Sequence, residues 1–171
     1  MLRIRNGEQL ERQLMTSDGQ EARLAFNRPG TTFTYSGNVV VGSTASGVFE
    51  VVTSGETNMS LFVTNARVKM ARSGVPSGYS AMRVHWFNEA PSGISDGAAL
   101  VVNSGDSAKY KGYSDLLGTV DLGQTIVTQG TLLNKQILLK SASVWLALTP
   151  STVFAAASGT PYQVELDYFV V

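Results

Sequence analysis

The fold of this chain is constrained most strongly by short segments in which apolar and polar residues alternate. In residues 162–171 every second side chain is apolar, namely Val164, Leu166, Tyr168 and Val170. Alternation with a period of two places one face of a β-strand on a core and the other face in water. Because the pattern recurs along most of the chain, we expect antiparallel β-sheets rather than helices.

Turn-forming residues separate these segments at regular intervals. Gly, Pro and Ser gather at residues 73–78, 90–93, 149–151 and 157–161. The expected strands lie near residues 31–41, 48–53, 60–71, 80–88, 98–103, 112–120, 125–128, 131–140, 143–149 and 162–171. Many short strands with regular turns predict an all-β fold, specifically an antiparallel β-sandwich that is jelly-roll-like.

The first 30 residues differ from the rest of the chain in their high content of charged residues. They hold nine of the 26 charged side chains and close with Asn27-Arg28-Pro29-Gly30, a sequence that breaks regular structure. A total of 171 residues suits one domain of ordinary size. We therefore predict an extended N-terminal arm over residues 1–30 and a β-sandwich domain over residues 31–171.

Apolar side chains of the arm lie beside charged ones. They are too apolar for a solvated tail, so they require a surface, which belongs either to the domain itself or to a partner. We predict that the arm binds a partner through the apolar anchors Leu2, Ile4, Leu10, Leu14 and Met15 and through the charged Arg3, Arg5 and Arg12.

Few residues suit catalysis or metal binding. The chain has one His, His85, and no Cys, which leaves too few ligands for the usual transition-metal sites. His85 lies in an expected strand among aromatic residues, where a structural role is the more common one. Glu165 and Asp167 share a strand face and raise the alternative of a glycoside hydrolase. Cross-strand pairing with Arg67, Lys69 or Arg83 is their expected role, so we predict no catalytic residue, metal or cofactor, and no enzymatic activity.

The charge balance bears on possible partners. The 13 Lys and Arg residues equal the 13 Asp and Glu residues in number. Proteins that bind nucleic acid or anionic membranes normally carry a basic surplus, and no apolar run approaches the roughly 20 residues of a membrane-spanning helix. We therefore expect neither nucleic acid nor membrane as a partner. Binding of a surface glycan stays an alternative, through Trp86, Trp145 or Tyr110, although we expect both tryptophans in the core.

Two blocks of the sequence, residues 80–116 and 132–171, carry three motifs of a known family. The first motif comprises Phe87, Asn88, Pro91, Asp96, Ala98 and Ala99. The second comprises Ala108, Lys109, Tyr110, Gly112 and Tyr113. The third comprises Trp145, Leu146, Leu148, Thr149, Pro150, Gly159, Val164 and Leu166. Over roughly residues 60–171 the chain resembles a family of small virion proteins encoded by tailed bacteriophages, often beside the major capsid protein. Residues 92–95 depart from the family pattern, and residues 1–30 have no counterpart in it.

The resemblance implies a structural protein of the virion. The expected function is that of a capsid decoration, or cement, protein, which binds the assembled shell of the major capsid protein and stabilises it by added contacts. The expected location is the outer capsid surface, after synthesis in the cytoplasm of the bacterial host, and the expected assembly is a homo-oligomer, either a trimer or a dimer. A tail, neck or fibre-base adaptor and a carbohydrate-binding β-sandwich module are the alternatives.

Overall fold

The computed structural model of the chain describes residues 19–131 and 133–171. Its strands, in chain order, are β1 (Gln20–Asn27), β2 (Phe33–Tyr35), β3 (Phe49–Val52), β4 (Ser60–Met70), β5 (Met82–Phe87), β6 (Tyr110–Leu116), β7 (Gly118–Asp121), β8 (Ile126–Gly130), β9 (Lys135–Leu138), β10 (Ser143–Pro150), β11 (Phe154–Ala156) and β12 (Pro161–Val170). One short 3-10 helix, η1, spans Ser104–Asp106. Within the described residues, no helix has the length and apolar character needed to span a bilayer.

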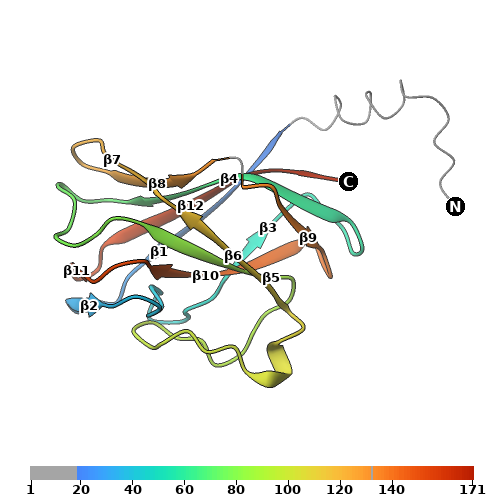
Figure 1. Cartoon of the computed structure of the whole chain (residues 1–171), viewed down its shortest axis with the longest axis horizontal. Coiled ribbons are helices and arrows are strands. Elements are labelled where there is room, and N and C mark those ends of the chain that lie inside the picture. Colours follow the sequence, from blue (N-terminus) through green and yellow to red (C-terminus); the bar gives the residue numbers. More distant parts are fainter. Residues whose placement is uncertain (1–18, 132) are drawn as a thin grey trace, which may run out of the picture.

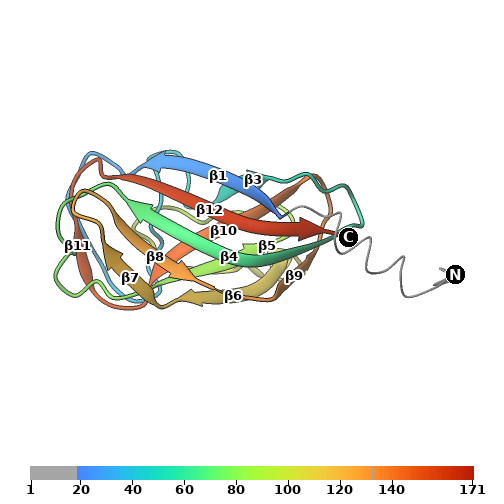
Figure 2. The ribbon, with the colours of Figure 1, turned by 90° about the horizontal axis from the view of Figure 1, so that it is seen from above.

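The strands form two main sheets that pack face to face (Figures 1 and 2). The larger sheet has the order β1–β12–β4–β8–β7, with β9 also paired to β4, and the smaller sheet has the order β3–β10–β5–β6. A third sheet contains only β11 and β2, and the strand pairs of all three sheets are antiparallel. The expected all-β fold and antiparallel sandwich are therefore confirmed.

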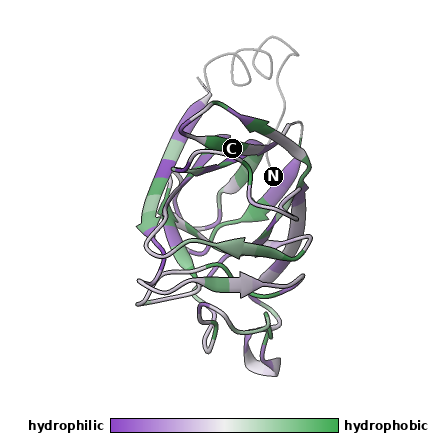
Figure 3. Cartoon of the chain, turned by 90° about the vertical axis from the view of Figure 1, so that its left-hand side faces the viewer, coloured by the Kyte–Doolittle hydropathy of each residue, from purple (hydrophilic) through white to green (hydrophobic). Residues whose placement is uncertain are grey.

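The core lies between the two main sheets, whose layers are seen end-on in Figure 3. Each strand contributes the apolar side of its alternating pattern. The contributors include Leu61, Val68 and Leu166 of the larger sheet and Val84, Trp86 and Leu146 of the smaller sheet, all at most 1% exposed. This packing of two apolar faces supplies the main stabilisation of a β-sandwich.

A second apolar cluster lies on the outer face of the smaller sheet. Phe87 and Ala147 point to this face because they alternate with the inward-facing Trp86 and Leu146. The loops before β3 and before β6 cover them with Val40 and other apolar residues, namely Val48, Ile94, Leu100 and Val102. Loops that connect to strands of the smaller sheet thus cover part of its outer face.

The expected boundary between arm and domain requires a correction. Gln20–Asn27, which we expected in the arm, forms β1 at one edge of the larger sheet and pairs with β12 along its whole length. Ala22 is buried, and Leu24 and Phe26 pack against the main core. Glu21 and Arg23 occupy the outward positions of this alternation, and the high charge of residues 1–30 led to the prediction of an arm instead of a strand. The part of the predicted arm that precedes Gly19 lies outside the described residues.

Strand β4 contains an irregularity that changes which side chains face the core. Asn65 pairs with Asp167 and Val63 pairs with Tyr168, so Thr64 is one extra residue in the ladder. Such a bulge shifts the alternation by one position. Phe62 therefore faces outward, although it is separated from the inward-facing Ala66 by an even number of residues.

Two further expectations about strands were wrong. Residues 98–103 form no strand, although Ala99 makes an isolated bridge to Val39. The short strand β11 was not expected, because the segment between the turns at 149–151 and 157–161 is too short to show a period.

Phe26 offers a test of the place of β1 in the fold. Its ring stacks on Phe49 of the smaller sheet at 4.1 Å between centroids and on Tyr162 of the larger sheet at 5.4 Å. We expect Phe26→Ala to lower the free energy of unfolding by about 2–4 kcal/mol, since truncating a packed aromatic removes burial and leaves a cavity. Urea unfolding measures this, with the outward-facing Ala25→Ser as the control that stays within about 0.5 kcal/mol of the wild type. Equal stabilities of the two variants would contradict the assignment.

Candidate binding surface

The outer face of the larger sheet has an apolar end. At this end of β4, Ser60 pairs with Leu138 of β9 on one side and exchanges backbone hydrogen bonds with Val171 on the other side. Two residues further along β4, Phe62 stacks on Phe169 of β12, with ring centroids 5.0 Å apart and planes at 4°. Leu138 is 48% exposed and Val171 is 52% exposed. We call Phe62, Leu138, Phe169 and Val171 the apolar patch.

Charged side chains occupy the same face next to the apolar patch. Asp167 accepts two hydrogen bonds from Arg67, at 2.8 and 3.0 Å. Glu165 accepts from Lys69 Nζ at 2.6 Å and from Arg67 Nε at 3.1 Å. Apolar surface bordered by charged groups is the usual composition of a protein–protein interface.

These ion pairs decide the role of the two carboxylates. Glu165 and Asp167 pair across the strands with Arg67 and Lys69, as expected, while Arg83 pairs with Asp115 at 2.7 Å. Burial raises the pKa of Glu165, but the hydrogen bonds from Lys69 and Arg67 outweigh burial, so the pKa lies below its usual value. A general acid in glycoside hydrolysis needs the opposite, a carboxyl with a raised pKa.

Of the three aromatic residues considered for a glycan, one is fully buried and two are half-buried. Trp86 is fully buried and donates its indole N–H to Ser114 Oγ at 2.9 Å. Trp145 and Tyr110 pack against the second apolar cluster. Tyr113 is 52% exposed, but the guanidinium of Arg83 lies over its ring at 4.0 Å. In the sequence this exposed tyrosine belongs to the second motif, with Lys109 and Tyr110.

His85 is a buried, hydrogen-bonded residue of the smaller sheet. Its Nδ1 lies 3.1 Å from the Tyr110 hydroxyl and its Nε2 lies 3.0 Å from Thr149 Oγ1. Burial, followed by the charge of Arg83, lowers the pKa of His85 to about 4. The imidazole is therefore neutral at pH 7 and joins β5 to β6 and β10, in agreement with the structural role expected for it.

A buried polar network was not foreseen from the sequence. Arg28, whose side chain is fully buried, donates to Tyr35 Oη at 2.5 Å and to the carbonyl oxygen of Ala157 at 2.9 Å. Tyr35 in turn donates to Asp96 Oδ1 at 2.6 Å, and Gly42 N donates to the same oxygen at 2.7 Å. The network ties the end of β1 to three loops, so the Asp96 of the family motif has a structural role here.

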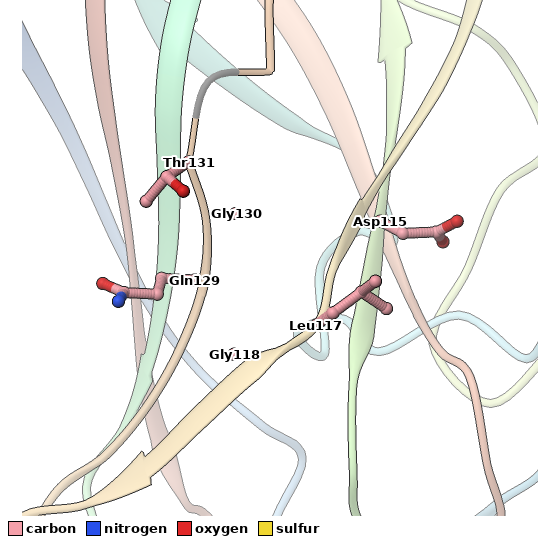
Figure 4. Close-up of a pocket in the computed structure, with 6 residues that line it drawn as sticks. All are labelled: Asp115, Leu117, Gly118, Gln129, Gly130 and Thr131. Atoms are coloured by element: carbon pink, nitrogen blue, oxygen red, sulfur yellow. The ribbon is translucent and has the colours of Figure 1, made fainter.

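Two hollows of the described surface contain no group of side chains arranged for catalysis. One of about 290 Å³ lies between β6 and β8 and is lined by Asp115, Leu117, Gly118, Gln129, Gly130 and Thr131. In Figure 4 its Asp115 and Gln129 side chains point away from one another. A second hollow, of about 230 Å³, lies beside Asp96 and is lined otherwise by small residues, Pro29 and Ile94. Over residues 19–131 and 133–171, no group of three His, Asp or Glu residues is placed to hold a metal ion.

The predicted partner-binding residues Leu2, Arg3, Ile4, Arg5, Leu10, Arg12, Leu14 and Met15 all lie outside the described residues. The described chain begins at Gly19, next to Gln20, which pairs with Tyr168. This entry point lies beside Phe169 and thus beside the apolar patch.

The comparisons with known proteins do not place the chain in a family. No protein-family model matches it, and no curated protein does. Among solved structures, one of infectious bursal disease virus, Gx strain, is 13% identical, with 91% of this chain and 41% of that chain covered and a TM-score of 0.20. A similarity of this size carries no argument about fold or function.

His85 predicts a pH dependence of stability. Its pKa of about 4 in the folded protein lies below the ordinary histidine pKa of 6.5. The unfolded chain therefore binds a proton more readily, and the stability that is complete above pH 6.5 falls as the pH drops toward 4. We expect wild type to lose about 2 kcal/mol more between pH 7.5 and 4.5 than His85→Gln, measured by urea unfolding. Equal losses in the two proteins would show that another group carries the effect.

Glu165 predicts a second effect on stability. Its carboxylate is 4% exposed and pairs with Lys69 and Arg67, so removing its charge leaves Lys69 without an anionic partner and leaves Arg67 with Asp167 alone. We expect Glu165→Gln to cost about 1–3 kcal/mol of unfolding free energy at pH 7. Glu21→Gln makes the same change in the exposed pair with Arg23 and should cost less than about 0.5 kcal/mol. A neutral result at both positions would mean that the ion pairs contribute nothing net.

Proposed function

We propose that this chain is a decoration, or cement, protein of a tailed-bacteriophage capsid. In this role it binds the assembled shell of the major capsid protein and stabilises it by added contacts, without catalysis. The observation that carries the proposal is the apolar patch, which lies beside ion pairs on the outer face of the larger sheet. Such a surface suits binding to another protein surface rather than enclosing a small substrate.

The strand order adds support. The larger sheet runs β1–β12–β4–β8 and the smaller sheet runs β3–β10–β5–β6, before the additional β7 and β9 are counted. Numbered by their order in the chain, these eight strands form sheets 1-8-3-6 and 2-7-4-5. We infer from this order that the sandwich is a jelly roll, an architecture used in viral capsids and also in lectins. Since one architecture serves several functions, the partner itself is inferred from the resemblance over residues 60–171.

The energetics of a cement protein suit such a surface. Full burial of one Val or Leu side chain contributes roughly 1.5–3 kcal/mol, so the half-exposed Leu138 and Val171 together contribute about 2 kcal/mol at one contact. A capsid offers many equivalent sites, and each bound copy adds its contacts to the shell. We propose that the protein binds as a homo-oligomer, a dimer or a trimer, because a symmetric shell presents symmetric sites.

Co-sedimentation with phage heads tests the proposal. The purified full chain is mixed with heads of the source phage from which accessory proteins have been stripped. We expect saturable binding and a higher melting temperature of the heads. Leu138→Asp should weaken binding at least tenfold, which corresponds to about 1.4 kcal/mol.

Val120→Asp provides the matched control for that variant. Val120 is 49% exposed and lies on the same outer face. It pairs with Val127 of β8, which pairs with Lys69 of β4, whereas Leu138 pairs with Ser60, nine residues earlier in β4. That separation is about 30 Å at the rise of a β-strand, so Val120 lies well away from the apolar patch. It should bind heads like the wild type. No binding to heads, with binding to tails instead, would replace the cement function by that of a tail or neck adaptor.

A further inference from the structure

Strand β1 forms one edge of the larger sheet and pairs with β12 on one side only (Figure 2). We propose that two copies of the chain pair through this edge, β1 against β1 in antiparallel orientation, so that their larger sheets join into one. This inference concerns the association of the chain with itself and does not depend on the proposed binding to capsids.

Half of the residues of β1 turn their backbone N–H and C=O groups away from β12. Arg28 N donates to the carbonyl oxygen of Thr160 at 3.1 Å, in register with the pairs of β1 and β12. Bonded pairs recur at every second residue of an antiparallel ladder, so the even-numbered residues of β1 bond to β12. The residues that point these groups to the free edge are Glu21, Arg23, Ala25 and Asn27.

The edge at β1 has few of the features that keep edge strands from pairing. Such strands are usually very short, or carry a bulge, a Pro or a Lys. At the other edges of the two main sheets, β3, β7 and β9 have four residues each, and β6 has a register shift opposite β5. β1 has eight residues in an unbroken register and contains neither Pro nor Lys. Among the edges in the described part of the chain, it is the one most open to a further strand.

The charges of β1 fit a second copy of the same strand. Glu21 and Arg23 alternate with the buried Ala22, so they lie on the outer face, with side chains 37% and 62% exposed. In the register that sets Ala22 opposite Ala22 of the second copy, each Glu21 faces an Arg23, and opposite charges attract across the strands. The two neighbouring registers set Glu21 opposite Glu21 or Arg23 opposite Arg23, where like charges repel. The charge pattern therefore selects both the partner and the register.

This pairing has a consequence for the apolar patch. Antiparallel pairing of two identical strands creates a two-fold axis perpendicular to the joined sheet, and such an interface is the usual one for a homodimer. Both outer faces then point in the same direction, so the two apolar patches lie on one face of the dimer. Two linked patches bind a surface with two matching sites more tightly than either patch alone. Of the two assemblies considered above, the edge of β1 therefore favours the dimer.

Sedimentation equilibrium of the full chain tests this proposal, and we expect the mass of a dimer at micromolar concentration. Glu21→Arg leaves two cations on β1 and Arg23→Glu leaves two anions, so each variant should dimerise at least tenfold more weakly. An equimolar mixture of the two variants should recover the dimer, because every cation then faces an anion. This recovery also shows that both variants are folded.

Asp121→Arg is the matched control, since it reverses one charge on β7, at another edge of the same sheet. It should dimerise like the wild type. A wild type that sediments as a monomer or a trimer would overturn the proposal. A dimer that Glu21→Arg and Arg23→Glu leave intact would also overturn it, as would a loss of the dimer that mixing the two variants does not reverse.

Discussion

The pairing of β12 between β1 and β4 is the interaction on which the rest of the structure depends. Its inward side chains Val164 and Leu166 are fully buried in the core, while Glu165 and Asp167 anchor the ion pairs of the outer face. The same strand thus holds the sandwich together and contributes Phe169 and both carboxylates to the candidate binding surface. Because its two neighbours come from near the start and the middle of the chain, this pairing also brings distant segments into one sheet.

The outer faces of the two sheets differ in what covers them. The smaller sheet lies under its own loops, which form a second apolar cluster around Phe87 and Ala147. The larger sheet has no such loops over the described part of its outer face, and it satisfies its charges by pairing them across strands instead. An exposed apolar end on such a face has no role in holding the two sheets together, which is why we assign it to binding.

The sequence predicted the all-β sandwich well, since the alternation in β5 and β12 is strong and the turns contain Gly and Pro. It predicted the ion pairs of Glu165 and Asp167 because opposite charges on a shared strand face attract one another across the ladder. It missed β1, where Glu21 and Arg23 suggested a solvated arm. The Arg28–Tyr35–Asp96 network and the apolar patch could not be predicted, because each joins residues far apart in sequence whose proximity follows only from the strand order and register.

The extra residue at Thr64 has a consequence for how the outer face divides. On one side of it β4 presents Phe62 to the outside, and on the other side it presents Arg67 and Lys69. The bulge is therefore the border between two surface chemistries that share a single strand. Because Thr64 has no counterpart on β12, its deletion would restore a regular ladder and leave Leu61 and Val63 inside and Phe62 outside. A deletion anywhere else in β4 would need a new bulge to keep the same side chains on the surface, so the extra residue marks the one position of this strand at which its length can change without changing the face that each side chain occupies.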